Sequence, residues 1–281
     1  MVQYDGSGVK EQFILTRSGW QGTVLSSDMP GTCQTCGERM SVAVVTGSAS
    51  GIGAAITRTI AARFAEAEIV GWDIADAASV DVGSTASVQT ATAALPGPVR
   101  HVVLAAGVSR MALLTETTDE DWDFQFRVNT FGVFNCLRSL VPVMEDGGAI
   151  VVIDSMAGLR GAPLLSAYSA SKFAVTGLIE AATPEFAVRG IRINGVCPMY
   201  VRTPMQHREL RWEADALGST PEEVFEGYVR ATPIGRVAEP EDVADTVAFL
   251  LGDDSRYMTG SMLTVSGGAH LGMVYRPKSA E

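Results

Sequence analysis

Long apolar runs and basic charge are both scarce in this chain of 281 residues. No apolar run reaches the ~18 residues that a membrane-spanning helix needs, so the sequence predicts no membrane partner. The 32 acidic side chains outnumber the 21 basic ones, and the net charge of −11 argues against a nucleic-acid partner, which would need basic side chains. With 47% hydrophobic and 19% charged residues, the chain is not mostly disordered. We therefore expect a globular protein that acts on a small molecule.

Cysteine is also scarce, with four residues in the chain. Cys136 and Cys197 fall in apolar segments and are expected to be buried free thiols. Cys33 and Cys36 form a single CxxC pair, without a second pair or histidines at ligand spacing, so no metal site is predicted. The N-terminal residues lack the pattern of a secretory signal, and the expected location is the cytoplasm.

Lysine is the scarcest basic residue, with Lys10, Lys172 and Lys278 against 18 arginines. Lys172 is the only one of these in the body of the chain, where arginine is the usual base. Arginine and lysine are not interchangeable where chemistry requires a compact ammonium group. Lys172 is therefore a candidate functional residue before any motif is considered.

Apolar runs alternate with helical patterns after residue 40, whereas residues 1–39 are polar and predict a peripheral N-terminal extension. Strands are expected at Val42–Thr46, Glu68–Trp72, Val99–Ala105, Ala149–Ile153, Arg192–Val196 and Ser261–Val265. Helices are expected at Ile52–Ala65, Ser87–Ala94, Glu120–Leu140, Ala167–Ala187 and Glu241–Leu250. Continuous apolar strands between helices predict an α/β fold, a doubly wound Rossmann-type parallel sheet in one domain over 40–281. Residues 199–236 are expected to form a short helical substrate lid.

A glycine-rich segment joins the first expected strand of this domain to its first helix. Glycine is needed where a tight turn takes positive φ or approaches a phosphate closely, and the N–H groups at a helix N-terminus favour a pyrophosphate. The strand, loop and helix context makes the segment a candidate nucleotide loop. The residues expected to contact the coenzyme there are Gly47, Ser50, Gly51, Ile52 and Gly53.

An acidic residue, Asp73, ends the next expected strand. Its carboxylate can accept hydrogen bonds from both ribose hydroxyls of NAD and would repel the 2′-phosphate of NADP. At ~4 Å and an effective dielectric of ~20, one such repulsion costs about 4 kcal/mol, which screening reduces to a preference of roughly a hundredfold. The sequence therefore predicts NAD as the cofactor and disfavours NADP, with Asp81 and Val82 beside the adenine.

Four polar residues further along form a candidate catalytic group. Ser155 ends an apolar strand, and Tyr168 and Lys172 lie one helical turn apart on one face. A tyrosine with a pKa near 10 is a poor base at neutral pH, but a nearby ammonium favours the phenolate, so Lys172 is expected to lower the pKa of Tyr168. Asn129 on the preceding helix is expected to hold a water that links Lys172 to solvent.

Together these motifs resemble the short-chain dehydrogenase/reductase family, in its shorter single-domain branch, over about residues 41–269. Thr46-Gly47-x-x-x-Gly51-x-Gly53 resembles the coenzyme loop of the family. Ser155, Tyr168-x-x-x-Lys172 and Asn129 match its four catalytic positions in type and order. The closing Leu263-Thr-Val-Ser-Gly267-Gly268 is also similar to the family's pattern.

The resemblance implies a role for each matching residue. Tyr168 would be the general acid/base, and Ser155 would bind the reacting oxygen. Lys172 would hold the nicotinamide ribose and Asn129 the relay water. Thr203 would contact the nicotinamide carboxamide. Two family segments are altered: Leu104-Ala105-Ala106-Gly107 stands for Asn-Asn-Ala-Gly, and Pro198-Met199 for Pro-Gly, with Ala106, Gly107 and Pro198 still expected at the coenzyme.

The expected reaction is hydride transfer between a secondary alcohol or ketone and NAD. An apolar wall that includes Met156 and Met199 favours an apolar cyclic or steroid-like alcohol. His207 and other polar groups of the lid keep a sugar or polyol as the alternative. Acyl-thioester reductases typically use NADPH, which Asp73 disfavours.

A catalytically silent dinucleotide-binding regulator remains an alternative of another class. The resemblance also implies a homo-oligomer, a tetramer or dimer, that pairs the helices bearing Asn129 and Tyr168.

Overall fold

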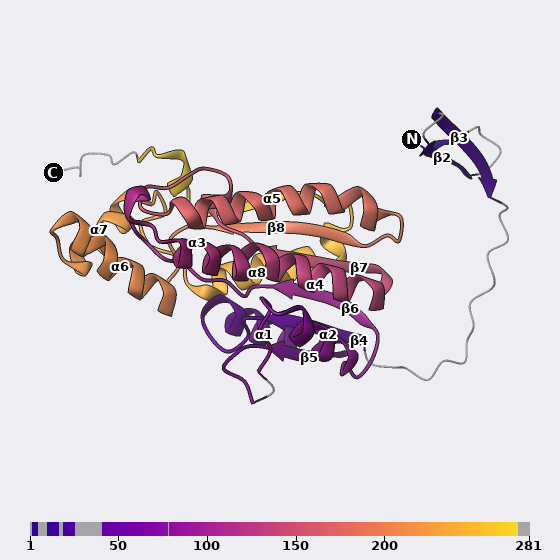
Figure 1. The fold of residues 1–281 in the computed structure, drawn as a ribbon, viewed down its shortest axis with the longest axis horizontal. Helices are drawn as coiled ribbons and strands as arrows, with labels where there is room; N and C mark the ends of the chain where they lie inside the picture. Colours follow the sequence, from indigo (N-terminus) through magenta and orange to yellow (C-terminus); the bar gives the residue numbers. More distant parts are fainter. Residues whose placement is uncertain (1, 5–9, 17–18, 26–40, 78, 275–281) are drawn as a thin grey trace, which may run out of the picture. The chain divides into compact units, whose positions relative to one another are not determined.

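The computed structural model describes residues 2–4, 10–16, 19–25, 41–77 and 79–274. The chain divides into two compact units, Met1–Arg39 and Met40–Glu281. In the first unit, β1 (Val2–Tyr4), β2 (Lys10–Thr16) and β3 (Gly19–Leu25) form an antiparallel sheet (Figure 1). The polar sequence of this segment predicts a peripheral extension and gives no sign of these strands. The Cys33–Cys36 pair lies outside the described residues.

The second unit is built on a six-stranded parallel sheet in the order β5-β4-β6-β7-β8-β9. Its strands are β4 (Ser41–Thr46), β5 (Ala67–Trp72), β6 (Val99–Leu104), β7 (Met144–Ile153), β8 (Arg192–Pro198) and β9 (Met262–Val265). Each corresponds to one of the apolar runs, and the predicted doubly wound Rossmann-type sheet is confirmed. From β4 the chain continues to β5 on one side and then returns to β6 on the other side, so the strand order reverses between β4 and β6. Such folds bind ligands at this point, beyond the carboxyl ends of the strands.

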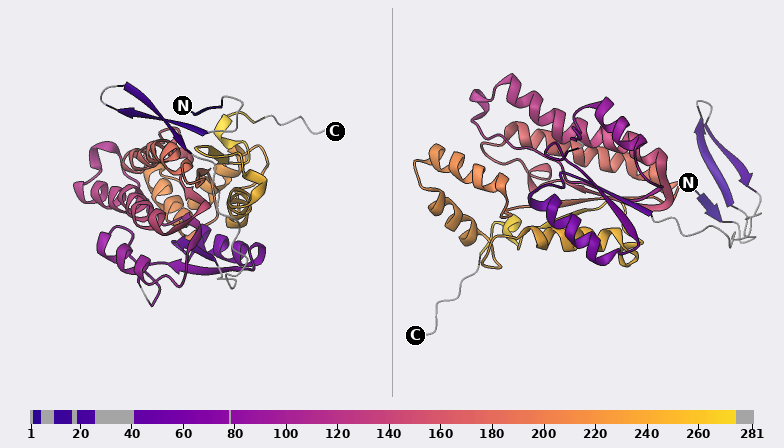
Figure 2. Two further views of the ribbon diagram at one scale, coloured as in Figure 1. Left: turned by 90° about the vertical axis from the view of Figure 1, so that its right-hand side faces the viewer. Right: turned by 90° about the horizontal axis from the view of Figure 1, so that it is seen from below.

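Helices cover both faces of this sheet (Figure 2). They are α1 (Gly51–Arg63), α2 (Thr85–Ala93), α3 (Asp119–Gln125), α4 (Gly132–Leu140), α5 (Ser166–Ala187) and α8 (Pro240–Leu251). Successive side chains of a strand point to opposite faces. Val44 of β4 accordingly packs with α2, α4 and α5, whereas its neighbour Val45 packs with α1 and α8. Both faces of the central strand are therefore buried, which explains its continuous apolar run.

The predicted single helix over Glu120–Leu140 is interrupted in the structure. A π-helical segment, Phe126–Phe131, separates α3 from α4 and carries Asn129. Gly132, which begins α4, packs so closely on Val82 that a Cβ atom would lie 2.8 Å from its side chain. Such π segments insert a wider turn, often at functional sites, and apolar periodicity alone does not reveal them.

Two further helices, α6 (Pro204–Leu217) and α7 (Pro221–Ala231), lie together at one end of this unit (Figure 1). The Thr203 side chain caps α6 by accepting from the N–H of Gln206, and Thr220 forms a capping box with Glu223 at the start of α7. Their own apolar cluster consists of Leu210, Ala214 and Val224, with Phe225 and Tyr228 packed against it. The pair therefore has a small core of its own beside the main sheet.

Short 3₁₀ turns complete the unit, at Leu114–Glu116, Val141–Val143, Met156–Gly158, Asp253–Ser255 and Ala269–Leu271. Among the described residues, no helix is both long and apolar enough to cross a membrane. In the same part of the chain, no group of three or more histidine, cysteine or acidic side chains is placed to hold a metal ion. Cys136 and Cys197 are buried free thiols, as predicted.

Candidate active site

The glycine-rich loop closes tightly on itself between β4 and α1. Gly47 and Gly51 have positive φ angles of 68° and 52°, which side chains rarely adopt. A Cβ atom on Gly53 would lie 2.0 Å from the Gly47 carbonyl oxygen, and one on Gly47 would lie 2.9 Å from the Ala106 backbone. The loop thus leaves free backbone N–H groups at the start of α1, beginning at Gly51, and these suit a phosphate.

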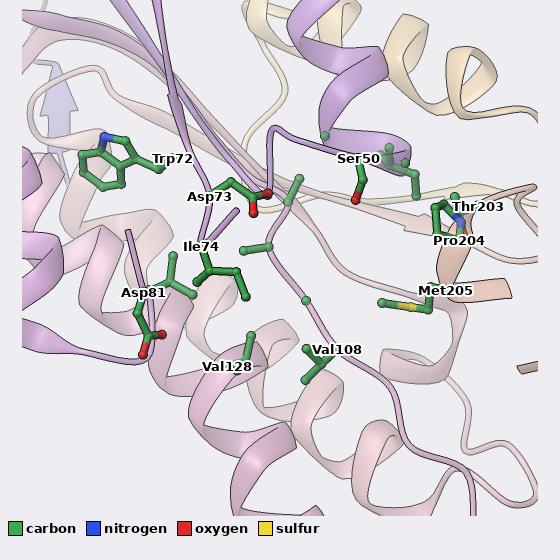
Figure 3. A pocket seen from close by; sticks show the side chains of 18 of the residues that line it. Ser50, Trp72, Asp73, Ile74, Asp81, Val108, Val128, Thr203, Pro204 and Met205 are labelled. Carbon is green, nitrogen blue, oxygen red and sulfur yellow. The ribbon is translucent and has the colours of Figure 1, made fainter. Parts of the chain in front are cut away.

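Asp73 stands where β5 ends beside this loop. Its carboxylate accepts one hydrogen bond from the Ala49 N–H at 3.1 Å and another from the Ala75 N–H at 2.9 Å. These bonds join the end of β5 to the phosphate loop. Figure 3 shows the Asp73 carboxylate on the side of the cavity that faces Ser50.

A cavity of about 390 Å³ extends from this loop to the first turn of α6. In Figure 3, Asp81 and Met205 lie at opposite sides of it. Its walls include most of the residues predicted at the coenzyme, namely Gly47, Ser50, Gly51, Ile52, Gly53, Asp73, Asp81, Val82, Ala106, Gly107 and Thr203. The predicted site residues that do not line this cavity are Asn129, Ser155, Tyr168, Lys172, Pro198, Met156, Met199 and His207. The structure therefore brings together most of the dinucleotide candidates, and Lys172 and Asn129 adjoin the same wall, since a Cβ atom on Gly107 would lie 3.9 Å from the Lys172 Nζ atom and 3.4 Å from the Asn129 Oδ1 atom.

Two backbone segments at this cavity are held by buried polar side chains. The Thr46 hydroxyl accepts hydrogen bonds from the N–H groups of Ala105 and Ala106, both at 3.0 Å. Asn129 accepts from the Val108 N–H at 2.8 Å and donates to the Val108 carbonyl at 2.9 Å. The loop after β6 is thereby fixed even though the polar residues of the family pattern are absent at 104 and 105.

Ser155, Tyr168 and Lys172 lie together at the end of β7 and the start of α5. The Ser155 hydroxyl accepts from the Ala157 N–H at 3.0 Å and caps the following turn. The Lys172 ammonium lies 5.8 Å from the centre of the Tyr168 ring and donates a hydrogen bond to the Ile153 carbonyl at 2.9 Å. Asn129 reaches the same region by donating to the Ser171 hydroxyl at 3.0 Å.

The electrostatics of Tyr168 differ from the expectation that Lys172 lowers its pKa. Burial raises the pKa of the phenol, and the negative charges of Glu209 and Asp154 raise it further, while a hydrogen bond with Ser155 acts in the opposite direction. Burial also lowers the pKa of Lys172, although the Asp154 charge opposes this change. Desolvation disfavours the charged form of both groups, an effect that sequence spacing does not show.

Asp154 is a neighbour of this group that the sequence reasoning missed. Its buried carboxylate accepts a hydrogen bond from the Thr176 hydroxyl at 2.8 Å, and burial raises its pKa. A Cβ atom on Gly158 would lie 2.6 Å from one of its oxygens. The signal was present, since an acidic residue at the end of an apolar strand, directly before Ser155, needs a reason to be buried.

The side chains predicted to contact the substrate differ in their burial. Met156 and Met199 are half-buried beside the ends of β7 and β8, whereas His207 is exposed on α6. The polar side chains on the buried face of α6 include instead Gln206, which is buried, and Glu209, which is half-buried. Sequence reasoning missed both, although their spacing of three residues places them on one helical face.

Comparisons with known proteins agree with this arrangement. A family model described as enoyl-(acyl carrier protein) reductase matches residues 39–270. Oxidoreductase UcpA of Salmonella typhimurium is 34% identical over 252 residues, which cover 82% of this chain and 94% of that protein. A 3-alpha-(or 20-beta)-hydroxysteroid dehydrogenase of Mycobacterium tuberculosis is 34% identical over 253 residues, 83% of this chain and 91% of the relative.

Among solved structures, ligand-free aldohexose dehydrogenase of Thermoplasma acidophilum superposes with a TM-score of 0.74 at 27% identity. The superposition covers 87% of this chain and 98% of that one. The fold, the order of the motifs and these relatives together show that the chain is an oxidoreductase that belongs to the short-chain dehydrogenase/reductase family.

Proposed function

We propose that the protein is an NAD-dependent oxidoreductase that transfers a hydride between a secondary alcohol or ketone and the nicotinamide, with Tyr168 as general acid/base. The observation that supports this most is the grouping of Tyr168, Ser155 and Lys172 at the carboxyl edge of the sheet, where Lys172 adjoins Gly107 in the wall of the dinucleotide cavity. Substrates of Rossmann-type folds meet the coenzyme at that edge.

Each residue of this group has a distinct part in alcohol oxidation. Tyr168, as the phenolate, takes the hydroxyl proton, and Ser155 donates a hydrogen bond to the reacting oxygen. Lys172 supplies the positive charge that favours the phenolate and binds the nicotinamide ribose. Asn129 holds the loop at Val108, and by the family resemblance it would position a proton-relay water. When bound, the nicotinamide accepts the hydride that leaves the substrate carbon.

The residues at the cavity fit a dinucleotide, and they support NAD over NADP. The glycine cradle, in which Cβ atoms at 47 and 53 would collide with backbone, suits a pyrophosphate. Asp73 places a negative charge beside that loop, at the end of β5. The carboxylate can bind two ribose hydroxyls and disfavours a phosphate at the same place. Asp81 and Val82 lie further along the wall, on the proposed adenine side.

Two substrate classes have support. Val108 in the cavity wall and the half-buried Met156 and Met199 favour an apolar cyclic alcohol, as does the hydroxysteroid dehydrogenase relative. The structural similarity to an aldohexose dehydrogenase favours a sugar or polyol. A dinucleotide-binding regulator without turnover is the alternative outside enzymes.

We further propose that residues 40–281 work as one dehydrogenase domain, with residues 199–236 as its lid and residues 1–39 as a peripheral extension, in the cytoplasm. A homo-oligomer, a tetramer or dimer, would pair the helices around Asn129 and Tyr168. The exposed side chains of Phe131, Phe134 and Phe173 on those helices support this pairing. Light scattering after gel filtration tests it, and a stable monomer at micromolar concentration would contradict it.

The decisive experiment follows NADH absorbance at mildly alkaline pH with a panel of cyclic alcohols, hydroxysteroids, sugars and polyols. Tyr168→Phe is expected to lower kcat by about 10³-fold or more, because no general base remains, while NADH binding persists. Tyr257→Phe changes a fully exposed tyrosine in the same way and serves as the matched control. NADH binding without turnover of any substrate would favour the regulator.

A further inference from the structure

The inner face of α6 is unusually polar for a helix that packs on the body of the protein. Gln206, Glu209 and Glu213 recur on the same face as the buried Leu210 and Ala214. Gln206 is only 4% exposed, and neither its Oε1 nor its Nε2 atom has a hydrogen-bond partner among the described residues. A buried amide of this kind is costly unless a ligand or another group satisfies it.

Glu209, one turn further along, connects α6 to the catalytic group. Burial raises the pKa of its carboxyl, and the adjacent Ser109 hydroxyl acts in the opposite direction. Ser109 is 4% exposed and directly follows Val108, the residue held by Asn129. The Glu209 charge also raises the pKa of Tyr168, so the carboxylate on α6 acts electrostatically on the phenol of α5.

The third polar residue, Glu213, already has a hydrogen-bond partner within the protein. It accepts a hydrogen bond from the Tyr228 hydroxyl of α7. The Tyr228 ring stacks on Tyr200 with centroids 3.9 Å apart and planes 11° from parallel. Glu213 therefore helps to hold the lid together, whereas Gln206 keeps free donors and acceptors.

We propose that Gln206 and Glu209 are specificity-determining residues that select a substrate with hydroxyl groups beside the reacting carbon, a sugar or polyol rather than a steroid-like alcohol. This inference rests on the proposed function. A carboxylate accepts hydrogen bonds from hydroxyls, and an amide both donates and accepts, so the pair can bind a vicinal diol. An apolar substrate would leave the buried Gln206 amide without a partner, and sites built to bind a hydroxyl reject analogues that lack it.

The test compares the full-length protein with its Gln206→Leu and Glu209→Gln variants on glucose, sorbitol, cyclohexanol and a hydroxysteroid. The wild-type protein is expected to oxidise a polyhydroxylated compound with a kcat/KM at least tenfold above that for cyclohexanol. Each variant is expected to lower kcat/KM for the hydroxylated substrate by tenfold or more, mainly through KM. Cyclohexanol oxidation, compared at the pH optimum of each variant, should fall several-fold less than oxidation of the hydroxylated substrate. Arg211→Leu, which alters an exposed position of the same helix, is the control.

The outcomes separate this inference from the proposed function. Preference of the wild-type protein for the steroid or cyclohexanol would overturn the inference and leave the reaction class intact. An equal loss on all substrates in both variants would also overturn it, since it would indicate a packing role. NADH binding and thermal unfolding of each variant show whether the fold persists. Absence of turnover with every substrate, despite NADH binding, would overturn the proposed function itself, and the inference with it.

Discussion

The coenzyme side and the lid side of the candidate site are built in different ways. The coenzyme side is formed by backbone: a glycine loop, the ends of parallel strands and the start of α1. The lid side is formed by side chains on α6 and α7, whose small apolar cluster is separate from the main core. Backbone geometry tolerates few residue types, whereas a helical face accepts many. The first side can therefore be recognised from a motif, and the second requires knowledge of what the helix contacts.

The largest expected effect compares one glycine from each side. In Gly53→Ala the new Cβ atom would collide with the Gly47 carbonyl, so the loop must open, and we expect NADH binding to weaken at least a hundredfold. Gly218 ends α6 with a positive φ of 64°, and a Cβ atom added there would meet open space. The comparison variant is therefore Gly218→Ala. This variant should lose about 1 kcal/mol of stability and bind NADH normally. Fluorescence titration with NADH gives the dissociation constant of each variant, and thermal unfolding gives its stability. Equal dissociation constants for Gly53→Ala and Gly218→Ala would contradict the difference between the two sides.

The next effect concerns one negative charge on each side. Asp73→Asn removes the repulsion of a 2′-phosphate, so the ratio of kcat/KM for NAD to that for NADP should fall by about a hundredfold. Glu209→Gln removes a charge from the lid and should leave this ratio unchanged. Steady-state kinetics with both coenzymes provide the measurement. An unchanged ratio in Asp73→Asn would show that this carboxylate does not determine coenzyme choice.

The same contrast explains what the sequence could predict. The parallel sheet and most of the helices around it followed from apolar patterns, and each strand of that sheet overlaps its expected range, although β7 begins at Met144 rather than at Ala149. The glycines and Asp73 lie around one cavity because the parallel strands β4 and β5 end side by side. In this part of the chain the residue types that the local sequence shows are the ones that the parallel sheet requires at the same positions.

The remaining features depend on contacts between distant residues. The π segment at Asn129 continues an ordinary helical pattern, and its packing of Gly132 on Val82 is visible only in three dimensions. The raised pKa of Tyr168 comes from burial and from Glu209, some forty positions further along the chain. The inward direction of Gln206 was likewise not evident, and the sequence reasoning chose the exposed His207 instead.

A smaller effect tests whether the lid acts on the catalytic group through charge. Burial and the negative charges of Glu209 and Asp154 raise the pKa of Tyr168, Cys197 acts in the same direction, and Lys172 is the nearby cation. Since the base must be the phenolate, removing the Glu209 charge in Glu209→Gln should move the acidic limb of the oxidation profile to lower pH. We expect a shift below about one pH unit, which corresponds to about 1.4 kcal/mol.

The pH dependence of kcat/KM between pH 6 and 10 shows this shift. Glu222→Gln removes an equal charge from an exposed position of α7 and is the control. A shift to higher pH, or the same shift in both variants, would contradict a direct effect of the Glu209 carboxylate on the phenol.

The smallest effect compares two helix caps of the same chemistry. Thr220 caps α7 in the lid, and Thr118 caps α3 outside it, each by accepting from the N–H three residues later. Replacing either threonine by alanine should cost about 1 kcal/mol. Because α7 is anchored by a small cluster, Thr220→Ala should raise the substrate KM several-fold without changing NADH binding, whereas Thr118→Ala should leave that KM unchanged. If both variants raised it equally, the lid would not be the less firmly anchored half of the site, and its helical face would be as constrained as the glycine loop.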